Sequence, residues 1–265
     1  MSIAELDDET VRSMAVGAAF TDYGGVISSL DFHRVDDLLV TASEDDSIRL
    51  YNIVDATVVS LCMSPINDSF MSGSLDHSVR IWDLRVNACQ GILRLRGRPT
   101  VAYDQQGLVF AVAMEGGAIK LFDSRSYDKG PFDTFLVGGD TAEVCDIKFS
   151  NDGKSMLLTT TSNNIYILDA YCGDKRCGFS LEPSIKSTTE ATFTPDGNYV
   201  VSGSGDGTLH AWNVYKRYEV ACWNSYIGSA TCLKWAPRRA MFAAASTALT
   251  FWIPNPSKSS ESTSA

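Results

Sequence analysis

Two short segments contain residue types that could do chemistry. The glycine-rich run Ser202-Gly-Ser-Gly-Asp-Gly207 resembles a phosphate-cradling loop, but neither a Lys-Ser/Thr pair nor a predicted helix follows it, so we interpret it as a turn. Cys172 and Cys177 lie five positions apart, which is the wrong spacing for a CxxC zinc or redox pair. The seven cysteines form no framework, as expected for reduced thiols inside a cell. We therefore predict no metal ligands and no cofactor.

Three groups of charged residues are candidates for contacts with protein partners. They are Glu44, Asp45 and Asp46; Arg94, Arg96 and Arg98; and Arg238 with Arg239. The acidic run would accept a basic peptide, or else consists of a structural Asp45 with two solvated neighbours. The arginine stripe would hold an acidic or phosphorylated peptide through forked hydrogen bonds, or else carries outward charges that protect a sheet edge, which we favour. The sequence does not decide whether the last pair faces solvent or a partner.

Composition excludes several classes of function. The formal net charge of −10 makes direct binding of nucleic acid a poor expectation, because such binding needs clustered Lys and Arg. No stretch of about 18 apolar residues is present, so we expect no transmembrane helix. The first residues are acidic and have no apolar segment typical of a secretory signal. The predicted partners are therefore proteins, with no membrane and no small-molecule substrate.

A segment of the chain recurs several times. It reads GSLDHSVRIWD at residues 73–83, GSGDGTLHAWN at 203–213 and ASEDDSIRLYN at 42–52. Weaker copies end near residues 122, 168 and 252, which makes six recognisable repeats. An internal period of this kind must be interpreted before any single motif.

Each copy follows a short segment with apolar residues at positions i, i+3 and i+5. These segments start at residues 27, 58, 98, 144, 188 and 230, with degraded first positions at 98 and 188. A turn and a short apolar strand lie between each segment and its copy, as in Thr194-Pro-Asp-Gly197 followed by residues 199–201. Small antiparallel sheets repeated around a ring form a β-propeller, so we predict an all-β fold.

The spacing of the repeats is irregular at one point. The residue that closes each third strand falls at 51, 82, 122, 168, 212 and 252, so the first interval is 31 residues and the others are 40 to 46. The longer linkers contain predicted outer strands at 90–95, 131–137, 176–181 and 219–224. Five residues between Asn52 and Val58 cannot form such a strand, so we predict that the first blade lacks it. Residues 15–21 are predicted to supply the outer strand of the last blade.

The pattern resembles the WD-repeat family, and Trp82-Asp83 is a literal WD dipeptide. The resemblance implies that Asp45, Asp76 and Asp206 cap tight turns. It also implies that Trp82 and Trp212 each close the third strand of their own repeat. In that family a His from a Gly-His pair joins the turn Asp, but none of the three histidines here follows a Gly. We therefore expect packing to hold the blades together.

Longer strings are similar to one subfamily. They are residues 58–76, 82–91, 127–135 and 149–154, and the resemblance covers residues 14–253. It is to the WD-repeat subunit shared by the COMPASS SET-domain histone methyltransferase complex and the RNA cleavage and polyadenylation machinery, and it is closest to plant members. It implies a WD-repeat β-propeller at 14–253, preceded by a partly disordered leader at 1–13 and followed by a disordered Ser/Pro-rich tail at 254–265.

The resemblance also implies a function. It indicates a nuclear, non-catalytic scaffold that helps a SET-domain methyltransferase modify lysine 4 of histone three. Alternative partners are the cleavage and polyadenylation machinery, with the phosphorylated polymerase tail, and phosphatase subunits. A propeller enzyme with a channel metal is disfavoured, because acidic residues do not recur on the inner strands. Full-length relatives resemble seven-bladed propellers, so the short first interval also predicts a missing blade and leaves open a truncated form with impaired assembly.

Overall fold

The computed structural model confirms a chain built almost entirely of β-strands. It describes residues 7–20, 27–32, 39–43, 58–74, 76–86, 88–95, 97–137, 143–181, 190–230, 232–236 and 239–255. Among these residues no helix is long and apolar enough to span a membrane.

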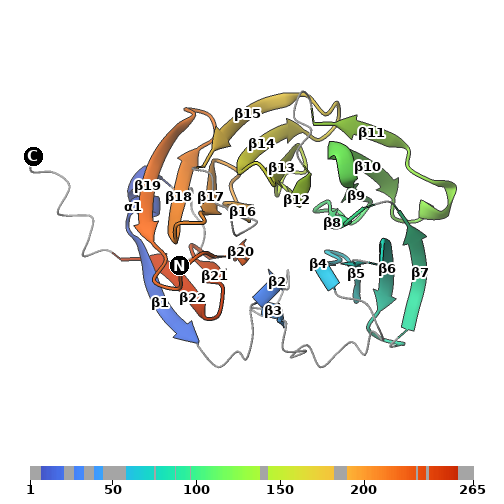
Figure 1. The fold of residues 1–265 in the computed structure, drawn as a ribbon, viewed down its shortest axis with the longest axis horizontal. Coiled ribbons are helices and arrows are strands. Elements are labelled where there is room, and N and C mark those ends of the chain that lie inside the picture. The colour runs from blue at the N-terminus through green and yellow to red at the C-terminus, as the bar shows by residue number, and fades with distance from the viewer. Residues whose placement is uncertain are drawn as a thin grey trace, which may run out of the picture.

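Small antiparallel sheets stand around a common centre, as Figure 1 shows. Blade 1 contains β2 (Ile27–Phe32) and β3 (Leu39–Ser43). Blade 2 contains β4 (Val58–Met63), β5 (Ser69–Ser74), β6 (Ser78–Asp83) and β7 (Ala88–Arg94). Blade 3 contains β8 (Thr100–Tyr103), β9 (Val109–Ala113), β10 (Ala118–Asp123) and β11 (Asp133–Leu136). Blade 4 contains β12 (Val144–Phe149), β13 (Ser155–Thr160), β14 (Asn164–Asp169) and β15 (Lys175–Ser180). Blade 5 contains β16 (Ala191–Phe193), β17 (Tyr199–Gly203), β18 (Thr208–Asn213) and β19 (Tyr218–Asn224). Blade 6 contains β20 (Cys232–Trp235), β21 (Phe242–Ala245), β22 (Leu249–Pro254) and, from the other end of the chain, β1 (Met14–Phe20).

The predicted propeller is confirmed by this arrangement. The four predicted outer strands are β7, β11, β15 and β19. The inner strands of blades 1, 2 and 4 start at the predicted apolar segments, and those of blades 3, 5 and 6 start two or three residues later. β1 pairs antiparallel with β22, which confirms that the N-terminal segment supplies the outer strand of the last blade. The last sheet of the ring therefore combines strands from both ends of the chain.

Blade 1 is described only in its two inner strands. β2 contacts both β4 and β20, so the first repeat lies between blades 2 and 6 despite the short interval. The predicted third strand of this blade, its predicted missing outer strand and the acidic run Glu44, Asp45 and Asp46 fall on residues 44–57, which lie outside the described residues.

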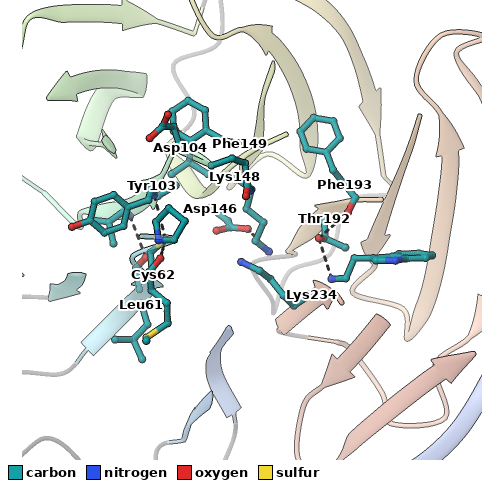
Figure 2. A pocket seen from close by; sticks show the side chains of 18 of the residues that line it. Leu61, Cys62, Tyr103, Asp104, Asp146, Lys148, Phe149, Thr192, Phe193 and Lys234 are labelled. Atoms are coloured by element: carbon teal, nitrogen blue, oxygen red, sulfur yellow. Dashed lines mark hydrogen bonds and ion pairs between the residues drawn. The ribbon is translucent and has the colours of Figure 1, made fainter. Parts of the chain in front are cut away.

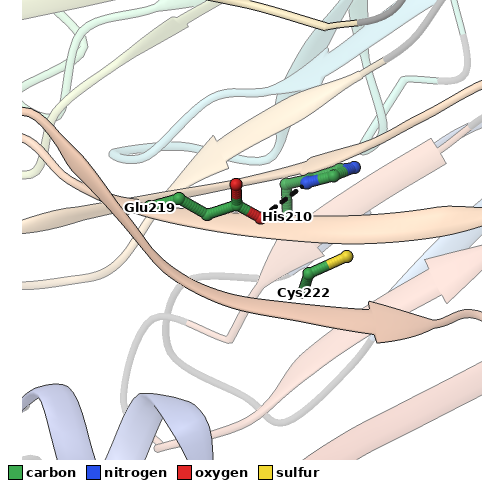
Figure 3. Close-up of side chains that lie close together, drawn as sticks. All are labelled: His210, Glu219 and Cys222. Carbon is green, nitrogen blue, oxygen red and sulfur yellow. Dashed lines mark hydrogen bonds and ion pairs between the residues drawn. The ribbon is translucent and has the colours of Figure 1, made fainter.

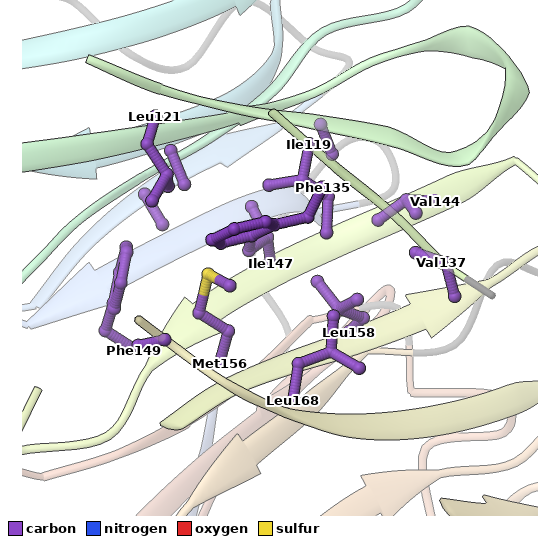
Figure 4. Packing of buried hydrophobic residues seen from close by; sticks show 14 residues of the cluster. Ile119, Leu121, Phe135, Val137, Val144, Ile147, Phe149, Met156, Leu158 and Leu168 are labelled. Atoms are coloured by element: carbon purple, nitrogen blue, oxygen red, sulfur yellow. The ribbon is translucent and has the colours of Figure 1, made fainter. Parts of the chain in front are cut away.

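The middle strands are apolar on consecutive residues because both faces of a blade are covered by its neighbours. In β9 and β17 almost every residue is buried. Figure 4 shows one junction, where Phe135 and Ile119 of blade 3 meet Ile147 and Met156 of blade 4. Similar buried clusters lie between blades 2 and 3, 4 and 5, and 5 and 6. Apolar surface between blades, rather than one central core, therefore stabilises the ring.

The glycine that opens the repeated segment has a packing role. A Cβ on Gly73 would lie 2.3 Å from the carbonyl oxygen of Pro99, which leads into blade 3. A Cβ on Gly203 would lie 2.8 Å from the carbonyl oxygen of Ala230, which leads into blade 6. At both positions the chain entering the next blade passes too close for any side chain.

The sequence did not predict the short helix α1 (Asp8–Arg12). Asp7 caps its N-terminus, with the Thr10 amide donating to the Asp7 carboxylate at 2.7 Å. The hydroxyls of Tyr199 and Tyr218 donate to the Asp8 carboxylate. Because these tyrosines belong to blade 5 and β1 belongs to blade 6, the leader joins the last two blades.

Candidate functional site

The inner strands of blades 2 to 6 surround a central hollow of about 140 Å³ (Figure 2). Its wall is mixed: Cys62 and Tyr103 lie on one side, and Lys148, Thr192 and Lys234 on the other. The hollow is smaller and more polar than a typical small-molecule pocket, so it has room for little more than one side chain of a partner.

Lys148 is the centre of a charged cluster on this wall. Its Nζ lies 3.0 Å from a carboxylate oxygen of Asp146 and 3.2 Å from one of Glu190. It also donates to the backbone carbonyls of Ala191 and Leu233, each at 2.9 Å. The amide of Leu233 in turn donates to the Glu190 carboxylate at 2.9 Å. One ammonium on blade 4 therefore bonds to the inner strands of blades 5 and 6.

Burial and charge both act on this cluster. Burial raises the pKa of the Glu190 carboxyl to about 7, and the nearby Lys148 ammonium only partly offsets this effect. Burial alone would lower the pKa of the Lys148 ammonium, but the carboxylates of Asp146 and Glu190 outweigh it and hold that pKa above its ordinary value. Lys148 is thus protonated and fully engaged, so its role here is to hold the wall together rather than to act as a nucleophile.

Neutral side chains make further bonds between inner strands. The Val101 amide donates to Ser60 Oγ at 3.1 Å, Thr100 Oγ1 donates to the Cys145 carbonyl at 3.0 Å, and the Trp235 amide donates to Thr192 Oγ1 at 3.3 Å. These bonds join blades 2 and 3, 3 and 4, and 5 and 6. With Lys148 they form a polar inner rim across five consecutive blades.

A second cluster lies away from the hollow, on the outer half of blade 5 (Figure 3). His210 on β18 and Glu219 and Cys222 on β19 place their ligand atoms within 4.8 Å of one another. His210 Nδ1 lies 2.9 Å from a Glu219 carboxylate oxygen. Burial and the carboxylates of Glu219 and Asp206 raise the pKa of the Cys222 thiol. These residue types are all ligands for transition metals.

The predicted arginine stripe is not a compact patch. Arg94 is exposed and ends the outer strand of blade 2, whereas Arg98 is half-buried just before the inner strand of blade 3. Within the part of the chain described, the buried Nε of Arg98 has no hydrogen-bond partner. Arg239 is exposed, and its carbonyl accepts from the indole of Trp235 at 3.0 Å. Arg96 and Arg238 lie outside the described residues. The contact role of the arginines stays a prediction.

The first aspartates of the repeated segments lie between the second and third strands of blades 2 and 5. Asp76 accepts from Ser78 Oγ at 2.6 Å, between β5 and β6, and Asp206 accepts from Thr208 Oγ1 at 2.6 Å, between β17 and β18. Asp83 accepts from the Arg85 guanidinium at 2.8 Å, and this bond contributes most to lowering the pKa of that carboxyl to about 2.

The two tryptophans of the repeated segment are held differently. The Trp82 indole donates to Ser72 Oγ at 2.9 Å and stacks on Phe70. Trp212 stacks between Phe179, with ring centroids 5.2 Å apart, and His210, at 5.5 Å. Trp82 therefore pins two strands of its own blade, whereas Trp212 also contacts the neighbouring blade 4.

Sequence reasoning missed both charged clusters. Asp146 and Lys148 are two positions apart on an otherwise apolar strand, so they lie on the same face of it. This spacing could have revealed that both line the hollow. Their partner Glu190 is 42 residues beyond Lys148 and gave no local signal. His210 and Glu219 are nine positions apart and lie on paired strands. Their contact depends on a register irregularity between β18 and β19, which the sequence does not reveal.

The sheets and repeated segments define a WD-repeat β-propeller. The WD domain, G-beta repeat model matches residues 17–52, 55–83 and 177–213. The chain is 63% identical to "Protein ANTHESIS POMOTING FACTOR 1" of Arabidopsis thaliana, over 98% of this chain and 96% of that protein. It is 34% identical to WD repeat-containing protein 82 of Drosophila melanogaster, over 94% of this chain and 97% of that protein.

A third relative belongs to a named complex. The chain is 33% identical to the COMPASS component SWD2 of Saccharomyces cerevisiae, over 63% of this chain and 53% of that protein. The chain belongs to the WD-repeat protein family that includes these three relatives. The predicted resemblance to this family, and its closeness to plant members, are confirmed.

Proposed function

We propose that the chain is a non-catalytic scaffold subunit of a nuclear, COMPASS-like complex that methylates lysine 4 of histone three. The observation that carries this proposal is the similarity to a COMPASS component, together with relatives aligned over nearly the whole chain. The fold supports it, because rigid blades with bonded inner strands present loops without needing to move.

A binding role also agrees with the charged groups of the hollow. In that cavity Lys148 is saturated by carboxylates and carbonyls, as expected for a group that maintains structure. The proposed mechanism is therefore the holding of partner segments in a fixed geometry. Links to RNA cleavage and polyadenylation factors, or to a phosphatase, are the alternative assemblies.

We further propose that the chain lacks about one blade present in its relatives. The alignment with the Arabidopsis protein runs over 318 positions, whereas the chain has 265 residues, so at least 53 positions have no counterpart here. A repeat of this type takes about 40–45 residues. The contacts of β2 with β4 and β20 support a ring in which blade 1 still packs between blades 2 and 6 despite the loss.

Purification of the tagged full-length chain from nuclear extract tests the scaffold proposal. Recovery of a SET-domain methyltransferase is the expected result. Recovery of cleavage and polyadenylation factors or phosphatase subunits alone would favour the alternative assemblies. Recovery of chaperones alone, together with a weak thermal transition, would indicate an assembly-impaired form and contradict the proposal.

Charge reversal tests the proposed contact residues. Arg94→Glu is expected to reduce recovery of the partner if the outer end of the stripe contacts it, while Lys129→Glu, also exposed and on the outer side of blade 3, serves as the control. Equal recovery with both variants would remove Arg94 from the contact surface. The same comparison applies to Arg239→Glu.

A further inference from the structure

The hydrogen bonds around His210 have a fixed direction. Thr208 Oγ1 donates its single proton to the Asp206 carboxylate at 2.6 Å. The contact of 2.8 Å between Thr208 Oγ1 and His210 Nε2 therefore requires the ring nitrogen to donate, because the hydroxyl has no second proton. Nε2 carries a hydrogen, and the other ring nitrogen, Nδ1, is the one directed at Glu219.

That direction leaves Nδ1 and the Glu219 carboxylate facing each other at 2.9 Å. A neutral imidazole with hydrogen on Nε2 has only a lone pair at Nδ1, and a carboxylate oxygen is also only an acceptor. Two acceptors at this distance need a positive charge between them. Either a second proton on the ring or a bound cation supplies it, and the neighbouring thiol of Cys222 offers a third ligand for a cation.

Cys222 lies directly opposite His210 in the β18–β19 pair. Its sulfur, the Glu219 oxygen and the His210 nitrogen lie within 4.8 Å of one another. Around a tetrahedral Zn²⁺ the corresponding ligand atoms are about 3.3–3.6 Å apart, from bond lengths of about 2.0–2.3 Å. The His210–Glu219 separation of 2.9 Å would lengthen and the separations from the sulfur would adjust, and side-chain rotation is available for this because Cys222 and Glu219 are exposed. We propose that His210, Glu219 and Cys222 bind a Zn²⁺ ion.

The surroundings of His210 favour a metal ligand. The ring is stacked on Trp212, with an interplanar angle of 14°, so it is held in place before any ion arrives. Its Nε2–H is bonded through Thr208 to Asp206, the kind of outer partner that fixes the orientation and tautomer of a metal-bound histidine.

Zn²⁺ would replace the thiol proton and any proton on Nδ1, and both protons pass to water. Because Glu219 and Cys222 are exposed, water or a side chain of a partner would complete the tetrahedron. This inference departs from the sequence-based expectation of no metal, and it is independent of the proposed scaffold function.

Titration of the reduced full-length chain with Co²⁺, followed by Zn²⁺ competition, tests the site. The expected result is a thiolate-to-cobalt charge-transfer band that saturates at one equivalent and disappears when Zn²⁺ is added. Cys222→Ser should abolish the band, and Glu219→Gln should weaken Zn²⁺ binding about tenfold or more. Thr208→Val, which removes the outer partner, should weaken it about 10–100-fold.

Cys172→Ser is the matched control, because Cys172 is exposed on blade 4 and lies next to Asp174 instead of a histidine. It should leave the band and the affinity unchanged. The absence of a charge-transfer band in the unaltered chain, or a band that persists in Cys222→Ser, would overturn the proposal and leave a His210–Glu219 ion pair. Circular dichroism of the metal-free variants checks that each is folded.

Discussion

Replacement of Lys148 by Met removes one ammonium from the inner rim and leaves its partners in place. The side chains of Asp146 and Glu190 are only 13% and 19% exposed, so the variant leaves two carboxylates largely without solvent. The carbonyls of Ala191 and Leu233 also lose their common donor. The methionine fills much of the space of the lysine stem, so the change is mainly one of charge and hydrogen bonding.

The expected loss follows from that geometry. Removing one partner of a buried ion pair costs about 3–5 kcal/mol, because the remaining charge is left uncompensated. We expect about 3 kcal/mol at pH 8, the lower end of that range, because both carboxylates keep some contact with water. At pH 5 the loss should be smaller, since the raised pKa of Glu190 allows it to take up a proton.

Urea unfolding at pH 8 and pH 5 measures both quantities. Lys154→Met is the control, because Lys154 is exposed at the turn before β13 of the same blade, and it should change the free energy of unfolding by less than about 0.5 kcal/mol. Adding Glu190→Gln to Lys148→Met should recover part of the loss. A loss below about 1 kcal/mol at pH 8, or one that does not change with pH, would refute the role assigned to Lys148.

Three further predictions concern Glu190 itself, the junction of blades 2 and 3, and helix α1. Burial raises the pKa of Glu190 from 4.5 to about 7, so the stability that its protonation contributes is full below about pH 4.5 and is lost as pH rises through about 7. Glu190→Gln should therefore flatten the pH dependence of the urea midpoint between pH 5 and pH 8, and an unchanged slope would contradict this. Gly73→Ala should lower the free energy of unfolding by about 1–3 kcal/mol, because its Cβ meets the backbone of Pro99, and a neutral result would show that the junction of blades 2 and 3 adapts. Asp8→Asn should loosen α1 and speed tryptic cleavage after Arg12, whereas Glu9→Gln should not; equal cleavage rates would mean that the Tyr199 and Tyr218 bonds do not hold the helix.

The strands of this fold were predictable because their signals are local. Alternating and consecutive apolar residues indicate half-buried and fully buried strands, and linker length shows where an outer strand fits. The same logic placed residues 15–21 in blade 6, where β1 pairs with β22. In the segment 203–213, Asp206 lies just before β18 and Trp212 lies within it.

The side-chain clusters were not predictable, because their members come from separate strands. Lys148 meets Leu233 across 85 positions, and that contact exists only once blades 4, 5 and 6 stand around one centre. Helix α1 was missed because five residues with one apolar position have almost no helical period. Its docking depends on Asp8 reaching tyrosines about 190 to 210 positions away.

Quantitative affinity purification of the tagged chain from nuclear extract, followed by an assay of the eluate for methylation of lysine 4 of histone three, tests the proposed scaffold role. We expect a SET-domain methyltransferase to co-purify in stoichiometric amount and the eluate to be active, whereas the chain alone is not. A folded, monodisperse chain that recovers neither the methyltransferase nor the activity would contradict it.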